Sequence, residues 1–137
     1  MNKTVFIIIS VIFLLWNLMG LGAFIAEMAF PELMEEQMNA TQLDTYRARP
    51  WWYVIFYAMA TVAGFLGAIL LLARKKLAVT MIFISLLGVI GTTGYNLYNG
   101  SWELIESGDK IMFLSVSILS VLYLVFARYA AQKGLLK

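Results

Sequence analysis

The sequence contains no cysteine and no histidine. Without cysteine the chain can form no disulfide framework, no thiol redox centre and no cysteine zinc site. Without histidine it lacks the common ligand of haem and zinc and the usual general base of enzymes. It also lacks a Gly-x-Ser-x-Gly nucleophile element. We therefore expect no metal site, no cofactor and no catalytic residues, and an enzymatic function is disfavoured.

Charged residues are also scarce. They make up 13% of the 137 residues, whereas 62% of the residues are hydrophobic and the mean hydropathy is +0.83. A soluble domain has roughly 25% charged and 45–50% apolar residues. We therefore expect an integral membrane protein with the lipid bilayer as its surroundings. The net charge of only +2 provides no electrostatic footprint for nucleic acid, which is not expected as a partner.

The charges divide the chain into long uncharged runs. A membrane-spanning helix needs about 17–25 largely apolar residues, and four runs meet this length. None shows the alternating pattern of barrel strands. The fourth run is short, but Arg128 can extend its side chain to the interface. The sequence predicts an all-α bundle of four transmembrane helices in a single membrane domain, 1–137, with helices at 4–29, 51–73, 77–98 and 111–131 and outer loops at 30–50 and 99–110.

The basic residues are divided unequally between the two ends of these helices. The N-terminus, the 74–76 turn and the C-terminal tail carry seven of the ten Lys and Arg residues and no acid. The other loops carry Arg47, Arg49, Lys110 and all eight acidic residues. Because cytoplasmic loops are enriched in Lys and Arg, we expect both termini in the cytoplasm and an electronegative outer face.

The first outer loop carries signals for helix starts. Pro31 suits the first position of a helix, and Glu32 follows it in the first turn, where the helix dipole favours an acid. Thr41 and Asp44 have the spacing of a capping box. These signals predict one or two short interfacial helices, with a solvated linker as the alternative because the apolar spacing is imperfect.

Polar or small residues form a stripe on each predicted helix. At 100° per residue, each stripe occupies one face, and we expect these faces to meet inside the bundle. The small residues are candidates for helix packing: Ala60, Gly64, Gly67, Ala68 and Gly88. The polar residues are candidates for ligand binding: Asn17, Glu27, Tyr57, Thr61, Thr92, Tyr95, Asn96 and Ser117.

Structural roles are open for the same polar residues. Asn17 falls near the middle of the membrane, where an unpaired amide is costly, so a hydrogen bond to another helix is the alternative to ligand binding. Glu27 falls at the outer interface, where it is expected to be solvated or paired with Arg47 or Arg49. Ser and Thr commonly bond their own or a neighbouring helix.

The depth of the polar residues indicates where a cavity would open. Most of the candidates fall in the outer half of the predicted membrane domain, so a cavity is expected to open outward beneath the 31–50 segment. The centre of the membrane has no charged residue, which disfavours an ion-coupled pump. No selectivity filter is visible either.

Three segments resemble a family of small bacterial four-helix inner-membrane proteins. They are Leu14–Gly20 (LLWNLMG), Tyr46–Trp52 (YRARPWW), and Gly64–Ala68 (GFLGA) continuing through Leu72–Ala78 (LARKKLA). Members are mostly uncharacterised and are sometimes labelled sugar-transporter-like; the layout is also similar to DoxX-like proteins. The resemblance covers roughly residues 14–90. It implies a bacterial inner membrane and supplies no established active site.

Two classes of function follow from these observations. The first is the binding or transport of a neutral polar or amphipathic small molecule through an outward-opening polar cavity. Since four helices seldom enclose a whole transport pathway, a homodimer is expected in that case. The second is an accessory or structural role, in which small-residue helix faces bind lipid or another membrane protein.

Overall fold

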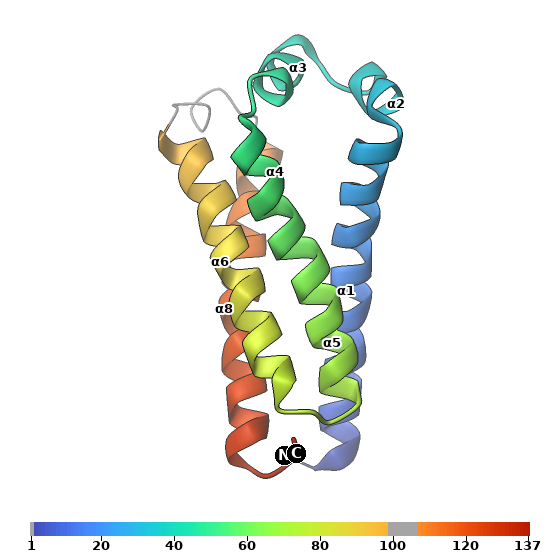
Figure 1. Cartoon of the computed structure of the whole chain (residues 1–137), viewed down its shortest axis with the longest axis vertical. Helices are drawn as coiled ribbons and strands as arrows, with labels where there is room; N and C mark the ends of the chain where they lie inside the picture. Colours follow the sequence, from blue (N-terminus) through green and yellow to red (C-terminus); the bar gives the residue numbers. More distant parts are fainter. Residues whose placement is uncertain (1, 99–106) are drawn as a thin grey trace.

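The computed structural model describes residues 2–98 and 107–137, apart from the side chains of 41, 42, 45, 96, 98, 107–109, 112 and 113. Four long helical segments lie side by side in an elongated bundle, and no strand occurs among the described residues (Figure 1). All four are long and apolar enough to cross a membrane, which confirms the prediction of a four-helix membrane protein. The long segments are α1 (Lys3–Ala29), α4 (Trp51–Ala58) continuing through the π-helical turn η1 (Met59–Ala63) into α5 (Gly64–Leu72), α6 (Leu77–Tyr98), and α8 (Ser107–Gln132).

The two ends of the bundle differ. Both termini and the turn between α5 and α6 lie at one end, called here the termini end. The opposite end, called the loop end, carries two short helices, α2 (Pro31–Glu36) and α3 (Ala40–Arg47) (Figure 1). The loop predicted to contain one or two short helices thus contains two. Their position at a membrane surface, like the side on which the termini lie, stays a prediction.

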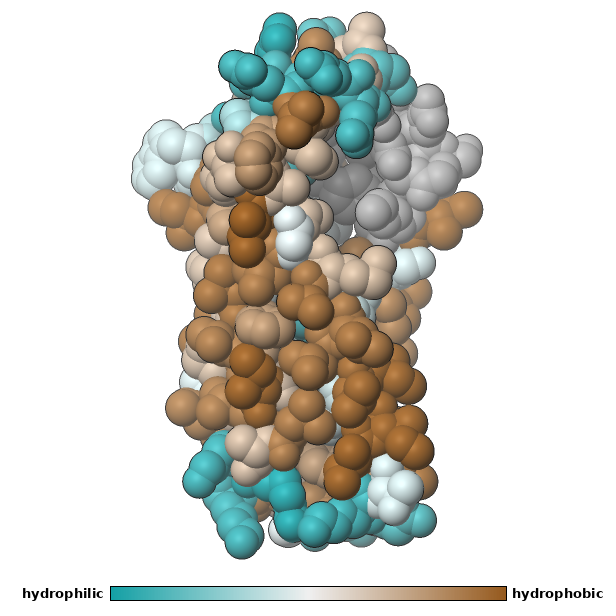
Figure 2. All heavy atoms as spheres, turned by 90° about the vertical axis from the view of Figure 1, so that its right-hand side faces the viewer, coloured by the Kyte–Doolittle hydropathy of each residue, from teal (hydrophilic) through white to brown (hydrophobic). Residues whose placement is uncertain are grey.

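The surface between the two ends is apolar. Figure 2 shows a broad hydrophobic belt across the middle of one face of the bundle, with hydrophilic residues gathered at both ends. Large apolar side chains of the long helices are exposed, such as Met19 at 75% and Ile111 at 65%. Soluble monomers rarely expose large contiguous apolar surfaces, so this belt fits the surroundings of a membrane protein.

The buried apolar core occupies the half of the bundle next to the termini end. Phe6 of α1 stacks on Phe126 of α8 with ring centroids 5.8 Å apart, and Phe13 stacks on Tyr123 at 4.5 Å. The remaining buried members of this core come from α5, α6, α8 and the C-terminal tail: Ala68, Leu71, Ala78, Ile82, Ala127, Ala130 and Leu136.

The C-terminal tail closes the termini end. Gly134 has a φ of 75°, and the Leu135 N–H reaches back to the Ala130 carbonyl at 2.9 Å, as in a Schellman motif. The tail then pairs with the α5–α6 turn: the Lys137 N–H donates to the Arg74 carbonyl at 2.7 Å. This pairing places Leu136, which is only 2% exposed, against the core.

The predicted packing residues lie between the helices. Gly64, Gly67, Ala68 and Gly88 are buried, and Ala60 is half-buried. A Cβ atom at Gly88 would lie 2.5 Å from the Phe56 carbonyl oxygen, so the backbones of α6 and the second span are in close contact. These small residues therefore serve the interior of this bundle and are not on its lipid-facing surface.

Candidate functional site

The second span is interrupted by the π-helical turn η1. Neighbouring helices supply hydrogen-bond donors to carbonyl groups at this turn: the Ser85 hydroxyl of α6 donates to the Ala60 carbonyl at 2.6 Å, and the Tyr123 hydroxyl of α8 donates to the Gly64 carbonyl at 2.9 Å. In lipid, irregular backbone is tolerated only where such partners exist. The turn is thus held by one side chain from each of two other spans.

Asn17 of α1 lies at the same level of the bundle as η1, which we call the middle layer, and its side chain is close to Gly64. It is 8% exposed, and its Nδ2 donates to the Phe13 carbonyl of its own helix at 2.8 Å. This bond lies within α1, one helical turn back, and the interhelical bond stays a prediction. The amide oxygen instead packs against Gly64 of α5, where a Cβ atom would collide with it.

A second group of polar residues surrounds Arg49 at the loop end. Arg49 Nη1 lies 3.3 Å from the Glu27 carboxylate, and the two side chains are only 22% and 11% exposed. The Arg49 guanidinium also lies 5.1 Å from the centroid of the Tyr46 ring and 4.6 Å from that of Tyr53. We call these four residues, Glu27, Tyr46, Arg49 and Tyr53, the arginine cage.

The tyrosines of the cage have further roles. The Tyr46 hydroxyl donates to the Glu27 carbonyl at 3.4 Å, which ties the end of α3 to the end of α1. Burial raises the pKa of this hydroxyl above its usual value, so the group remains a donor throughout the physiological pH range. Tyr53 is 3% exposed and forms the buried wall of the cage.

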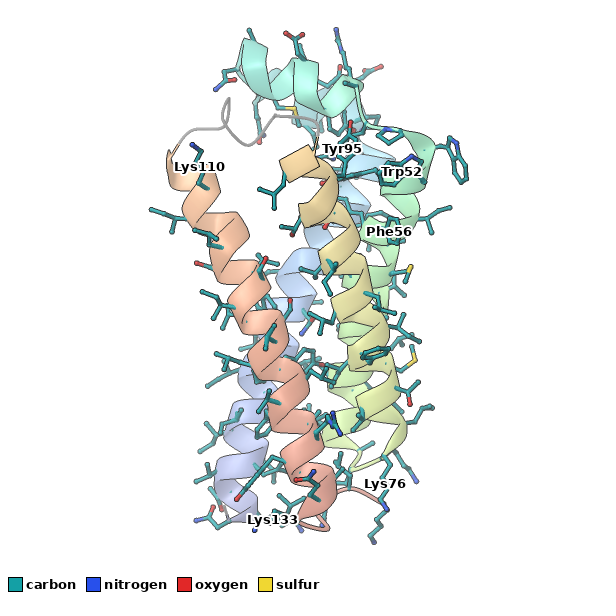
Figure 3. The ribbon with its side chains drawn as sticks, turned by 90° about the vertical axis from the view of Figure 1, so that its left-hand side faces the viewer. Trp52, Phe56, Lys76, Tyr95, Lys110 and Lys133 are labelled. Carbon is teal, nitrogen blue, oxygen red and sulfur yellow. The ribbon has the colours of Figure 1, made fainter. Side chains whose placement is uncertain are left out.

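An aromatic cluster continues from the cage toward α6 and toward the middle of the bundle. Tyr53 contacts Tyr95 edge to face with centroids 5.3 Å apart, and Tyr57 lies 5.0 Å from Phe24. Trp52 packs on Tyr95 at 5.2 Å, and Figure 3 shows these two side chains together at the loop end of α4 and α6. The Tyr95 hydroxyl donates to the Ala48 carbonyl at 3.3 Å.

The structure places five of the eight predicted site residues in two groups. Glu27, Tyr57 and Tyr95 join the aromatic cluster at the loop end. Asn17 and Thr61 lie in the middle layer, where the Thr61 hydroxyl donates to the Tyr57 carbonyl at 3.0 Å. The Asn96 side chain lies outside the described residues.

The last two candidates, Thr92 and Ser117, lie outside both groups. The hydroxyl of Thr92 donates to the Val89 carbonyl of its own helix at 3.0 Å. Ser117 lines a shallow hollow on α8 with Ile118, Val121 and Leu122. The two residues are half-buried.

Sequence reasoning did not include three residues that the site depends on. Tyr46, Tyr53 and Tyr123 are absent from the candidates for ligand binding that the sequence indicates. Arg49 was one of two possible partners of Glu27; the other, Arg47, pairs with Glu35 at 3.3 Å. Aromatic residues stand three positions before Arg49 (Tyr46) and four positions after it (Tyr53). This spacing is the one sequence signal that could have indicated the cage.

The fold and the site define a small, multi-pass helical membrane protein. The described residues bring together no group of His, Cys, Asp and Glu that could hold a metal ion. Comparisons with protein-family models, curated proteins and solved structures found no match to this chain.

Proposed function

We propose that this chain is a bacterial inner-membrane protein that binds a neutral polar or amphipathic small molecule in the loop-end half of the bundle. Both termini face the cytoplasm, so the loop end faces outward and α2 and α3 lie at the outer membrane surface. As a transporter it acts as a homodimer, since one four-helix unit is too narrow to enclose a whole pathway.

The observation that carries this proposal is a difference in packing between two halves of the bundle. The half next to the termini end (the termini half) is more fully buried than the half next to the loop end (the loop half). Apolar side chains of the termini half are fully buried, as with Phe6, Leu71 and Ala127, each 0% exposed. In the loop half, Tyr53 is buried, but several other polar and aromatic side chains are only half-buried: Phe24, Tyr57, Thr92, Tyr95 and Ser117. A ligand that enters between these residues displaces no close-packed core.

The chemistry of the loop half suits an amphipathic ligand. Tyrosine presents an apolar ring and one hydroxyl, and pockets lined mainly by such rings with a few polar groups are typical of small-molecule sites. Tyr57 and Phe24 supply ring surface, while the hydroxyls of Thr92 and Tyr95 supply polar groups nearer the loop end.

The second function class has less support. A partner that binds through small-residue helix faces needs those faces on the outside of the bundle. Gly64, Gly67 and Gly88 instead lie within it, against Asn17, Ile82 and the backbone of the second span.

Cysteine accessibility tests the proposal, because the natural chain has no cysteine to remove. Single variants Tyr57→Cys and Thr92→Cys are treated in sealed vesicles with a membrane-impermeant maleimide from the loop side. We expect both to react, with Leu33→Cys on α2 as the exposed control and Ala127→Cys as the buried control. Phenyl β-glucoside, a neutral amphipathic probe, should slow the reaction at Tyr57→Cys. Reaction at both positions as slow as at Ala127→Cys would overturn the proposal.

A further inference from the structure

We propose that Glu27, Tyr46 and Tyr53 form a binding site for an amphipathic organic cation, and that the Arg49 guanidinium is the resident, displaceable cation of this site. The inference rests on the loop-end binding site of the proposed function and assigns to that site a second class of ligand, a cationic amphiphile.

The three residues have the chemistry of a cation site. Aromatic faces attract a cation within about 6 Å of the ring centroid, and the attraction is strongest where water is excluded. The Tyr46 and Tyr53 rings lie 5.1 and 4.6 Å from the Arg49 guanidinium carbon. The Glu27 carboxylate, 11% exposed, supplies the compensating negative charge at 3.3 Å.

Arginine satisfies this site incompletely. Its guanidinium has five N–H donors, yet the site offers it a single carboxylate contact through Nη1. The Arg49 Nε is fully buried and has no hydrogen-bond partner. A buried donor without an acceptor costs free energy. A quaternary ammonium ion has no N–H groups to satisfy, so the site fits it better than it fits the guanidinium.

The surroundings provide for the rest of such a ligand and for its approach. Tyr57 lies beside Tyr53 at 6.4 Å, and Phe24 beside Tyr57 at 5.0 Å, so ring surface continues from the cage into the bundle. The neighbouring short helices carry four acidic residues and one basic residue: Glu32, Glu35, Glu36, Asp44 and Arg47. This charge balance draws cations toward the loop end.

Displacement of Arg49 has a direct consequence for the loop end. Arg49 lies between α3 and α4, outside any helix, and its ion pair joins this connection to the end of α1. A ligand that takes its place on Glu27 releases that link, while the Tyr46 hydroxyl still bonds the Glu27 carbonyl. Entry of the cation is thereby coupled to loosening of the 31–50 segment.

The test uses the full chain in detergent micelles and two probes of the same shape. Benzyltrimethylammonium carries the charge, and neopentylbenzene is its uncharged carbon isostere. Binding is followed by tryptophan fluorescence and by the shift of the unfolding temperature. Arg49→Ala vacates the site, and Arg47→Ala removes an arginine from the same segment whose side chain is 62% exposed and contacts no ring of the cage.

We expect Arg49→Ala to bind benzyltrimethylammonium about tenfold more tightly than the natural chain, because two ring faces and a carboxylate become free. The probe should also restore the unfolding temperature that this variant loses, whereas neopentylbenzene should not. Arg47→Ala should match the natural chain. Adding Glu27→Gln or Tyr53→Leu to Arg49→Ala should abolish the gain.

Equal binding of both probes to Arg49→Ala, or no gain over the natural chain, would overturn the inference. If Arg49→Ala does not fold, Arg49→Gln, which keeps an N–H donor toward Glu27, carries the same comparison. Tyr57→Cys removes a ring that packs on Tyr53 but leaves all four cage residues in place, so its labelling tests the loop-end site separately. If that position reacts and shows no cation preference, the cationic ligand is wrong but the loop-end site stands; if it does not react, the proposed function itself fails.

Discussion

Replacing Gly88 of α6 with alanine would place a methyl group against the backbone of the second span. The added Cβ would lie 2.5 Å from the Phe56 carbonyl oxygen and 2.6 Å from the Ala60 nitrogen. Ordinary contact begins at 3.4 Å, so α6 would have to move by 0.9 Å, the difference between 3.4 and 2.5 Å. Backbone atoms of a packed helix cannot give way as the end of a flexible side chain does.

The magnitude follows from opposing effects. Alanine favours a helix over glycine by about 1 kcal/mol, and burying one methyl group contributes about 0.8 kcal/mol. Against this, overpacking costs about 3 kcal/mol when backbone must shift. Moving α6 also stretches the 2.6 Å bond from Ser85 to the Ala60 carbonyl, which is worth about 1 kcal/mol. We expect a net loss of about 2 kcal/mol in the free energy of unfolding.

Titration with sodium dodecyl sulfate in mixed micelles, followed by tryptophan fluorescence, measures this loss. Gly94→Ala on the same helix is the matched control, because no heavy atom lies within 4 Å of its added Cβ. The control should be as stable as the natural chain or gain up to about 1 kcal/mol. If Gly88→Ala proves as stable as Gly94→Ala, the close backbone contact between α6 and the second span does not exist.

Two further substitutions test the middle layer and the termini end in the same titration. Tyr123→Phe removes the hydrogen bond to the Gly64 carbonyl and should lower the free energy of unfolding by about 1 kcal/mol. The control Tyr129→Phe, at a residue 36% exposed, should change it little. Equal effects of the two variants would contradict the donor role of Tyr123. Leu136→Ala should cost roughly 2–5 kcal/mol because the tail residue is buried. Leu77→Ala, at a residue 56% exposed at the same end, is its control, and a Leu136 variant as stable as this control would mean that the tail is not docked.

The positions of the long helices were predictable because charge marks the boundary of lipid. Lys3, Arg74 and Lys76 bracket apolar runs of the right length, and the helices begin or end beside them. Helix α8 is less sharply marked: it begins at Ser107 rather than at 111. The docking of Leu136 carried no sequence signal, since a short tail after a span has no characteristic pattern.

The candidate site was predictable in its location and less so in its contacts. The loop-end position of Glu27 and Tyr57 follows from their places along the helices, whereas the choice of Arg49 over Arg47 depends on how α3 meets α4. The π-helical turn at Met59–Ala63 could not be predicted, since Met, Ala, Thr and Val are ordinary residues of a membrane helix. Its hydrogen bonds come from Ser85 and Tyr123, far away in sequence.

The π-helical turn also sets the rotational phase between the two parts of the second span. One extra residue in a helix turns everything beyond it by about 100°. The direction of the aromatic face of α4 is therefore set independently of the direction of the glycine face of α5, and the two helices join at η1. Deleting one residue there would leave a regular helix in which one register is wrong. The turn thus lets the aromatic side chains of α4 and the glycines of α5 each face their own neighbours along one membrane span.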